Sequence, residues 1–333
     1  MNILVIGGAG YIGSHIVLEL LDTGGHQVTV FDNLSTGSLK NVPEGVGFIE
    51  GDILNDADLV RAFECDKFDV VFHFAALKAA GESMDEPGKY AHHNISGSIN
   101  ILNAMVENDV KKIIFSSSAA VYGYPEYLPI DENHPTKPVN FYGFTKLEIE
   151  RILKWYSQLK GLRFAALRYF NAAGYDVKGR ITEMEKNCAN LLPIVMETAD
   201  STREKVLIFG DDYDTPDGTG VRDYIHVNDL ATAHIKAMNY LDVEDKDLIV
   251  NLGTGIGYSV LDVINETKKI TGKAVPHKIV ERRPGDPDEL FAKSNYAEEL
   301  LDWKPQHSDL ETLFRSMWKM YRGSDDKLVS RNL

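Results

Sequence analysis

The stretch VIGGAGYIGSH at residues 5–15 constrains the fold more than any other part of the sequence. It follows the apolar run NILVI (2–6) and opens a segment with a helical pattern of apolar residues. Gly7, Gly10 and Gly13 have the spacing GxxGxxG, and glycines at a strand-to-helix turn let the backbone approach a pyrophosphate closely. The free N–H groups at the start of the helix favour the same anion. This context predicts a dinucleotide site.

Strand-like apolar runs alternate with helix-patterned segments through the first half of the chain. After NILVI, further runs lie at residues 27–31, 46–51, 69–75, 111–117 and 163–170. Continuous apolar strands that alternate with helices indicate a parallel sheet covered on both faces. The sequence therefore predicts an α/β fold built on a doubly wound parallel Rossmann sheet.

The pattern changes after residue 175, where loops lengthen and strand-like runs become scattered. We expect residues 1–175 to form a dinucleotide-binding Rossmann domain, to which the chain returns around residues 225–255. Residues 176–333 are expected to form a smaller α/β lobe that binds the substrate.

Asp32 ends the second strand, about 20 residues after the last glycine of the turn. A carboxylate at this place accepts hydrogen bonds from the adenosine ribose hydroxyls and repels a 2′-phosphate. The following run NLSTGS contains no arginine, so the predicted cofactor is NAD rather than NADP. Asp52 and the stretch FAALK (74–78) end the third and fourth strands, where ligands of such sheets bind. Spacing alone leaves Asp52 equally compatible with a turn or N-cap role.

The charge of the chain excludes some partners. With 333 residues and a formal net charge of −15, it lacks the basic surface of a nucleic-acid or anionic-membrane binder. An anionic ligand would need arginine and lysine gathered locally. Cys65 and Cys188 are the two cysteines and lie far apart, which favours the reducing cytoplasm and gives no metal-ligand spacing, so no metal is expected. No stretch approaches the roughly 20 apolar residues of a membrane span.

The stretch VNFYGFTKL (139–147) places Tyr142 and Lys146 four residues apart, on one face of a predicted helix. A phenol with a pKa near 10 is a poor base at neutral pH. A nearby ammonium and a positive nicotinamide each favour the phenolate, by about 1–3 pKa units for a close opposite charge. Such pairs also occur by chance, but here they follow a dinucleotide motif. Ser118 ends a strand and would hold the substrate hydroxyl.

These motifs give the chain a resemblance to the extended short-chain dehydrogenase/reductase superfamily and, within it, to the UDP-glucose 4-epimerase family. The resemblance runs from residue 2 to about 320, and its specific stretches are HFAALKAAGES (73–83), FSSSAAVYG (115–123), LRYFNAAG (167–174), GTGVRDYIHVNDLA (218–231) and NLGTGIGYSVLDV (251–263). It implies a tightly bound NAD, oxidation at sugar C4 to a 4-keto intermediate, rotation of that sugar, and hydride return to its other face. It also implies a homodimer formed through helices near 90–108 and 145–158.

The resemblance also implies roles for single residues. Ser118, Tyr142 and Lys146 would be catalytic, with Tyr142 as the base and Lys146 on the nicotinamide ribose. The implied cofactor contacts are Gly7, Gly10, Tyr11, Ile12, Gly13, Asp32, Asn33, Leu34, Ser35, Thr36, Gly37, Asp52, Ile53, Phe74, Ala75, Ala76, Leu77, Lys78, Asn94, Ser118, Tyr142, Lys146 and Phe170. The implied contacts to UDP-glucose or UDP-galactose are Ser118, Tyr142, Asn171, Asn190, Phe209, Arg222, Tyr224, Arg283 and Asp286.

Three alternatives stand beside this reading. Another NAD-dependent nucleotide-sugar epimerase would share the fold. A nucleotide-sugar 4,6-dehydratase would need an acid pair after the serine strand, where this chain has Ala119 and Ala120. A non-catalytic NAD-binding regulator would have no need of Ser118, Tyr142 and Lys146 together. Leu290 stands where the family gates the sugar C2 substituent, and its modest size favours acceptance of UDP-N-acetylhexosamines.

Overall fold

The centre of the molecule is a parallel sheet with the strand order β11-β6-β5-β4-β1-β2-β3. The computed structural model describes residues 1–185, 190–283 and 286–329. The seven strands are β1 (Asn2–Ile6), β2 (Gln27–Asp32), β3 (Gly47–Glu50), β4 (Val70–His73), β5 (Lys112–Ser118), β6 (Arg163–Tyr169) and β11 (Leu248–Leu252). The order reverses between β1 and β4, and ligands bind at the carboxyl ends of the strands beside such a reversal. The predicted α/β class and doubly wound sheet are confirmed.

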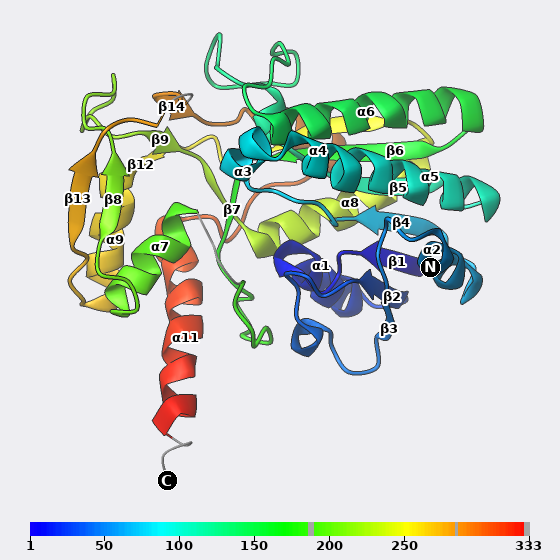
Figure 1. Cartoon of the computed structure of the whole chain (residues 1–333), viewed down its shortest axis with the longest axis horizontal. Helices are drawn as coiled ribbons and strands as arrows, with labels where there is room; N and C mark the ends of the chain where they lie inside the picture. The colour runs from blue at the N-terminus through cyan, green and yellow to red at the C-terminus, as the bar shows by residue number, and fades with distance from the viewer. Residues whose placement is uncertain (186–189, 284–285, 330–333) are drawn as a thin grey trace.

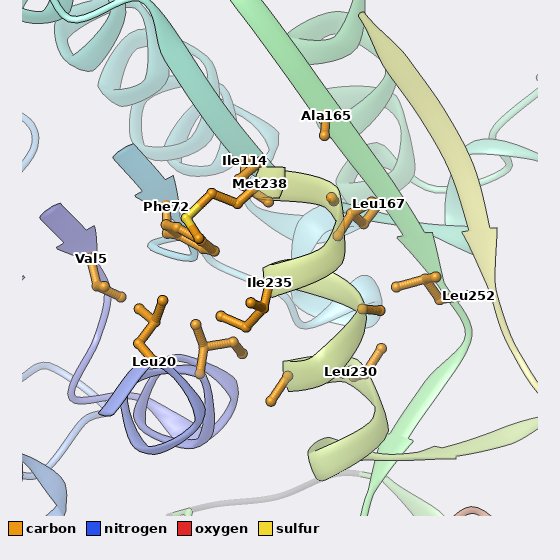
Figure 2. Close-up of a cluster of buried hydrophobic side chains, with 14 of the residues drawn as sticks. Val5, Leu20, Phe72, Ile114, Ala165, Leu167, Leu230, Ile235, Met238 and Leu252 are labelled. Carbon is orange, nitrogen blue, oxygen red and sulfur yellow. The ribbon is translucent and has the colours of Figure 1, made fainter. Parts of the chain in front are cut away.

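Helices cover both faces of the sheet (Figure 1). One face carries α1 (Tyr11–Thr23), α8 (Val227–Glu244) and α10 (Asn295–Leu301), and the other carries α2 (Asp56–Glu64), α5 (Gly97–Glu107) and α6 (Phe141–Lys160). Figure 2 shows the core between the sheet, α1 and α8, with Val5, Leu20, Phe72, Ile114, Ala165, Leu167, Leu230, Ile235, Met238 and Leu252. This burial of apolar surface on both faces fixes the strand ends that carry the site.

Residues beyond the first half complete the central sheet. Helix α8 packs along α1, and β11 pairs in parallel with β6 at the edge of the sheet. The sequence analysis did not mark β11 as a strand, because LIVNL is a short run that follows an acidic, solvent-exposed turn.

The second half also builds smaller sheets beside the first (Figure 1). These are the parallel pair β7 (Asn171–Ala173) and β10 (Tyr224–His226), the parallel pair β8 (Val206–Phe209) and β13 (His277–Val280), and the set β12 (Tyr258–Ser259), β9 (Val221–Arg222) and β14 (Glu289–Leu290). They pack with α7 (Leu191–Ala199), α9 (Val260–Thr271) and α11 (Leu310–Val329) around a separate apolar cluster. The β7–β10 pair connects this part to the end of β6.

Short helices complete the strand ends. They are η1 (Leu39–Asn41), α3 (Ala80–Asp85), α4 (Pro87–Tyr90), the π-helix η2 (Ala91–Ser96) and η3 (Ala119–Val121). Within the described ranges, the helices are too short or too polar to cross a lipid bilayer.

Candidate active site

The glycine-rich turn between β1 and α1 is packed too closely for side chains. Gly7 has φ +80°, and a Cβ atom there would lie 2.6 Å from the backbone nitrogen of Ala75. A Cβ on Gly13 would lie 2.2 Å from the carbonyl oxygen of Gly7. Gly10 caps α1, whose first turn begins with Tyr11; among the described residues, no side chain caps this helix start and its first turn has no acid. Open N–H groups and a positive dipole end fit a pyrophosphate.

Asp32 joins the end of β2 to this turn. One carboxylate oxygen accepts the N–H of Ala9 at 2.9 Å, and the other accepts the N–H of Leu34 at 2.8 Å. Burial raises the pKa of Asp32, while its backbone donors oppose the rise. The carboxylate oxygens keep further lone pairs, so this geometry fits a ribose diol at the place that the sequence predicted.

The loop after β2 folds back over the turn. Asn33 donates to the carboxylate of Asp52 at 3.0 Å and accepts the N–H of Ser35 at 3.0 Å. Thr36 and Gly37 line a small cavity together with Tyr11. The predicted adenosine-side residues therefore lie close together.

The stretch 74–78 continues β4 beside the turn and is held by Asn94. The side chain of this buried residue accepts the N–H of Leu77 at 2.9 Å and donates to its carbonyl at 3.0 Å. The same amide group donates to Thr145 on α6 at 3.0 Å. Asn94 thus fixes the β4 loop to the helix that carries Tyr142. Lys78 forms an ion pair with Glu185, so a cofactor phosphate would compete with that carboxylate.

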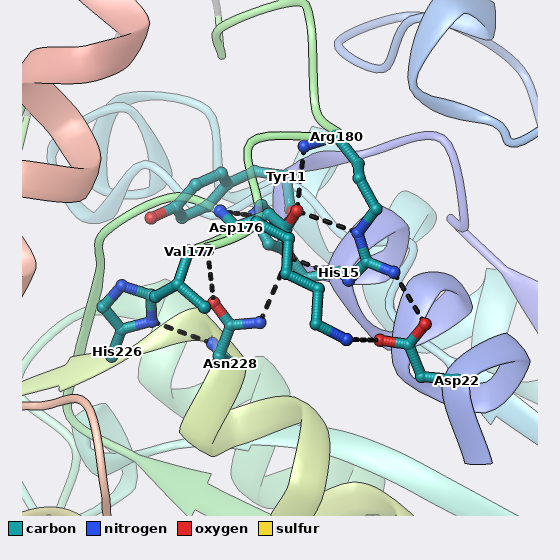
Figure 3. Close-up of polar contacts among 9 residues, drawn as sticks. Tyr11, His15, Asp22, Asp176, Val177, Arg180, His226 and Asn228 are labelled. Atoms are coloured by element: carbon teal, nitrogen blue, oxygen red, sulfur yellow. Dashed lines mark hydrogen bonds and ion pairs between the residues drawn. The ribbon is translucent and has the colours of Figure 1, made fainter.

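A polar network ties α1 to residues 174–180 (Figure 3). Tyr11 donates to the carbonyl of Gly174 at 2.5 Å, and Nε2 of His15 accepts the N–H of Asp176 at 2.9 Å. Asp176 binds the guanidinium of Arg180 through both of its oxygens, at 3.0 and 2.9 Å. This segment leaves β7 and leads toward α7, so the network holds the glycine-rich turn in place relative to the second half of the chain.

Tyr142 and Ser118 meet at the carboxyl end of β5. The phenol of Tyr142 lies near the hydroxyl of Ser118, which ends the strand and opposes the rise in the pKa of the phenol. Helix α6 comes this close because Gly143 packs on η3, where a Cβ atom would lie 2.3 Å from the carbonyl oxygen of Ala120. Asn140 caps the helix by accepting the N–H of Gly143 at 2.8 Å.

Lys146 lies one turn further along the same face of α6. Its Nζ atom is 5.8 Å from the centroid of the Tyr142 ring and 4.8 Å from that of Phe115. The ammonium donates to the carbonyl oxygen of Ser116 at 2.7 Å, and the residue is 2% exposed. Ser118, Tyr142 and Lys146, the triad predicted from the sequence, are thus brought together by two elements, β5 and α6.

Burial dominates the protonation of this triad. It raises the pKa of Tyr142 to about 12, although the hydrogen bond from Ser118 opposes the rise. It lowers the pKa of Lys146 to about 7, although the charge of Glu150 opposes the fall. The sequence analysis expected Lys146 to lower the pKa of Tyr142; in the protein alone, the desolvation of the phenol outweighs this effect.

A cavity of about 330 Å³ lies in the second half of the chain and is lined in part by β7, which follows β6. All seven residues predicted to bind the UDP part line it: Asn171, Asn190, Phe209, Arg222, Tyr224, Arg283 and Asp286. They come from β7, the start of α7, β8, β9, β10 and the segment before β14. No run of the sequence holds them together, so their convergence depends on the fold.

The cavity presents cations to a ligand. The guanidinium of Arg283 lies 3.7 Å from the centroid of the Phe209 ring, and within the described ranges it forms no ion pair. Arg222 donates to the carbonyl of Val221 at 2.7 Å and forms an ion pair with Asp286. Planar guanidinium groups that face a cavity suit a diphosphate.

The sequence analysis missed lining residues of this cavity. Lys205 and Leu207 stand with Phe209 on one face of the β8 segment, while Val206 and Ile208 point to the core. The alternation of strand side chains could have identified them once Phe209 was chosen.

Two residues connect the cavity to the triad. Phe170 is 9% exposed and belongs to an apolar cluster with Ala119 of η3, directly after Ser118. Leu290 packs against the same cluster, and its carbonyl accepts the N–H of Asp223, next to Arg222, at 3.1 Å. Leu290 therefore packs with residues that adjoin Ser118 and is bonded through its backbone to a neighbour of Arg222.

Comparison with known proteins agrees with this geometry. The NAD dependent epimerase/dehydratase family matches residues 3–253. The chain belongs to this family. A UDP-glucose 4-epimerase of Streptococcus mutans is 45% identical over 332 residues, which cover 98% of this chain and 100% of that protein. The resemblance identified from the sequence is confirmed.

Solved structures of relatives superpose along the whole chain. A UDP-glucose 4-epimerase of Bifidobacterium longum, in complex with NAD⁺ and UDP, has a TM-score of 0.91 and 40% identity, with 98% of this chain and 99% of that chain covered. A UDP-Glc/GlcNAc 4-epimerase of Campylobacter jejuni has a TM-score of 0.85 and 37% identity, with 97% and 99% covered. The glycine-rich turn and Asp32 fit NAD, the cofactor in the name of the family.

The turn geometry predicts the effect of one added methyl group. In Gly7→Ala, the new Cβ atom would collide with the backbone of Phe74 and Ala75, directly after β4, so the purified protein should lose most of its bound NAD. Gly24→Ala is the matched control, because Gly24 has φ +74° and open space around it. Both variants carry a backbone strain of about 1–3 kcal/mol, but only the first should elute without NAD in gel filtration. Equal retention of NAD would contradict the assignment of the turn.

Proposed function

We propose that the protein interconverts UDP-glucose and UDP-galactose with a resident NAD. The observation that carries this proposal is that Ser118 and Tyr142 lie at the carboxyl edge of the sheet that carries the glycine-rich turn, while a cavity with two arginines begins at Asn171, where β7 follows β6. One end of this arrangement suits a hydroxyl that must lose its proton. The other end suits a nucleoside diphosphate, and NAD, when bound, supplies the hydride acceptor for sugar C4.

The triad divides the work on the proton. Tyr142 accepts the proton of the sugar 4-hydroxyl, and Ser118 holds the same oxygen through a hydrogen bond. Lys146 stabilises the phenolate by its positive charge from one helical turn away. Because burial raises the pKa of Tyr142 to about 12, the phenol needs additional positive charge before it can act as a base near neutral pH.

The cavity anchors the part of the substrate that does not react. Arg222 and Arg283 would bind the diphosphate, while Asn171 and Asp286 offer polar groups to the nucleotide and sugar. Epimerisation requires the 4-keto sugar to present its other face before it is reduced. An anchor on the diphosphate leaves the sugar free to turn, which is the arrangement that inversion at C4 needs.

We propose the same division for the chain. Residues 1–175, with the return around 225–255, would bind NAD, and residues 176–333 would bind the UDP-sugar. A cytoplasmic location is supported by the exposed free thiol of Cys65, which is typical of a reducing compartment. Cys188 lies outside the described residues.

The dehydratase alternative lacks support at the reacting centre. Ala119 and Ala120 follow Ser118 in η3, so the described site offers no carboxylic acid there. Elimination would need such an acid to protonate the leaving oxygen. The relatives named above are epimerases, in agreement with this argument.

A wider range of sugars is favoured by Leu290. A leucine that packs next to the Ala119 and Phe170 cluster leaves room for a larger C2 substituent than a bulky aromatic would. The relative from Campylobacter jejuni, named as a UDP-Glc/GlcNAc 4-epimerase, supports the extension to UDP-N-acetylhexosamines.

A homodimer is supported by the outer face of α6. Phe144, Trp155 and Leu159 are 39%, 60% and 69% exposed and lie along one stripe of this helix. Tyr156 donates to Asn103 at 2.6 Å and so fixes α5 beside α6. Two such helix pairs would bury the stripe against a second copy of the chain.

The proposed base predicts the loss of activity on removal of one oxygen. Tyr142→Phe should lower the kcat for UDP-galactose by about 10²- to 10⁴-fold, in an assay with no added NAD. Tyr127→Phe is the control, since Tyr127 is exposed, its hydroxyl donates to Asp131 across a surface turn, and its ring packs on His134 away from Ser118 in sequence. Wild-type protein that forms no UDP-glucose, even with NAD supplied, would refute the function itself.

The sugar range is tested at Leu290. Leu290→Tyr should lower kcat/KM for UDP-N-acetylglucosamine by about 10- to 200-fold, because the ring fills space near sugar C2. The kcat/KM for UDP-galactose should stay within about threefold of that of the wild type. Leu290→Met conserves volume and should keep both activities. Failure of the wild type to convert UDP-N-acetylglucosamine would remove the wider range.

The dimer is tested on the exposed stripe. Trp155→Glu should convert the protein from dimer to monomer in light scattering, because a buried charge without a partner disrupts the helix pairing. Val243→Glu is the control on the opposite face of the sheet, where Val243 is 78% exposed. A monomeric wild type would refute the dimer.

A further inference from the structure

A buried carboxylate lies behind the triad and is left unexplained by the roles above. Glu150 is 1% exposed and stands four residues after Lys146 on α6, on the same face of the helix. Buried carboxylates are rare unless they are paired, because desolvation disfavours their charge. Here the partner is Arg168 of β6, which is itself 5% exposed.

Glu150 joins three elements of the site. One of its oxygens accepts hydrogen bonds from the hydroxyl of Ser117 at 2.5 Å and from Nε of Arg168 at 2.9 Å. The other oxygen accepts Nη2 of Arg168 at 2.5 Å. Helix α6, strand β5 and strand β6 are thereby fixed together one residue before Ser118. A bidentate guanidinium–carboxylate pair restricts both partners more than a single contact would.

The network continues to the edge of the sheet. Nη1 of Arg168 donates to the hydroxyl of Tyr122 at 2.9 Å, and this hydroxyl donates to Asn251 of β11 at 2.7 Å. Each buried group in the chain of contacts has a partner, so the network has no open position for a ligand. Its effect must pass through the residues that it holds.

The protonation states of the groups around Lys146 and Tyr142 show which of these neighbours are charged. His73 of β4 also lies near Lys146, and burial lowers the pKa of His73 to about 3, so it is neutral. Tyr90 of α4 and Tyr169 of β6 face Tyr142, and burial raises the pKa of each, so both are neutral as well. The charged groups that remain behind Lys146 are Glu150, one turn further along α6, and its partner Arg168.

Of these two groups, Glu150 is the one whose charge acts on the pKa of Lys146. Its negative charge opposes the desolvation that lowers the pKa of Lys146 to about 7. Arg168 is oriented toward Glu150 and Tyr122, on the far side of the carboxylate.

We propose that Glu150 is a positioning residue of the reaction, which fixes Ser118 relative to Tyr142 and keeps Lys146 in its ammonium form. The inference rests on the proposed function, since it assigns Lys146 and Tyr142 their roles. It adds a carboxylate, remote from the substrate, that sets the charge of the triad.

The first test is Glu150→Gln, in which shape is kept and charge is removed. Without the charge of Glu150, Lys146 should lose its proton at lower pH. The basic limb of the plot of kcat against pH should therefore shift to lower pH by about 1 unit. The kcat at pH 8 should fall by about tenfold or more, with KM for UDP-galactose and bound NAD unchanged. Glu148→Gln is the matched control, because Glu148 binds Arg151 on the outer side of the same helix and should leave the profile unchanged.

A second variant covers poor folding of the first. Removal of one partner from a buried pair is strongly destabilising, whereas removal of both charges is often tolerated. Glu150→Gln with Arg168→Met should fold and retain NAD, yet still show the lowered basic limb, because Lys146 lacks the carboxylate. A wild-type profile in either folded variant would overturn the proposal. So would a fall in kcat with an unshifted profile, which indicates a structural role alone.

A readout without turnover separates this inference from the proposed function. In NAD-loaded protein, the phenolate of Tyr142 is measured as the near-ultraviolet absorbance of the wild type minus that of Tyr142→Phe. Glu150→Gln should raise the pH at which this signal appears, because a neutral Lys146 no longer stabilises the phenolate. An unshifted signal refutes the role of Glu150 even where the sugar substrate is a different one.

Discussion

The approach of Gly7 to the backbone of Ala75 is the contact on which the site depends. It brings the ends of β1 and β4 together at the point where the strand order reverses. From there, Leu77 is held by Asn94, and Asn94 is bonded to Thr145 at the start of α6. A chain of short polar contacts thus runs from the glycine-rich turn to α6, the helix that carries Tyr142. The distance between these two parts of the site is set by backbone packing rather than by flexible side chains.

In an acidic protein that binds a diphosphate, cationic side chains must be gathered at the binding site. Here they lie in the second half of the chain, where Arg222 and Arg283 face one cavity while most surface lysines are paired with neighbouring acids. Arg222 is itself paired with Asp286, so its charge is moderated until a ligand enters. Two guanidinium groups that line one cavity offer several N–H donors to the oxygens of a diphosphate.

Much of this was predictable, for identifiable reasons. The glycine spacing, Asp32 and the Tyr142–Lys146 pair are local patterns, so the sequence alone places them on a parallel sheet and at its carboxyl edge. The cavity residues were predicted only through resemblance to a family, because six separate elements supply them. Lys205 and Leu207 were missed, since their orientation depends on which face of β8 is buried. Glu150 was missed because, in sequence, a glutamate on a long helix is usually a surface residue.

The pKa values could not have been read from spacing at all. Proximity of Lys146 to Tyr142 predicts a lowered pKa for the phenol, yet burial raises it to about 12 and lowers that of Lys146 to about 7. Burial therefore opposes the charged form of both groups, and for Lys146 the charge of Glu150 acts against this effect. Charge introduced beside the triad on the open side, together with Glu150 behind it, restores the ammonium and phenolate forms. The same desolvation that suppresses the base strengthens each of these interactions, since charges in a dry site are less screened. A buried triad of this kind acts as a base only in the assembled site.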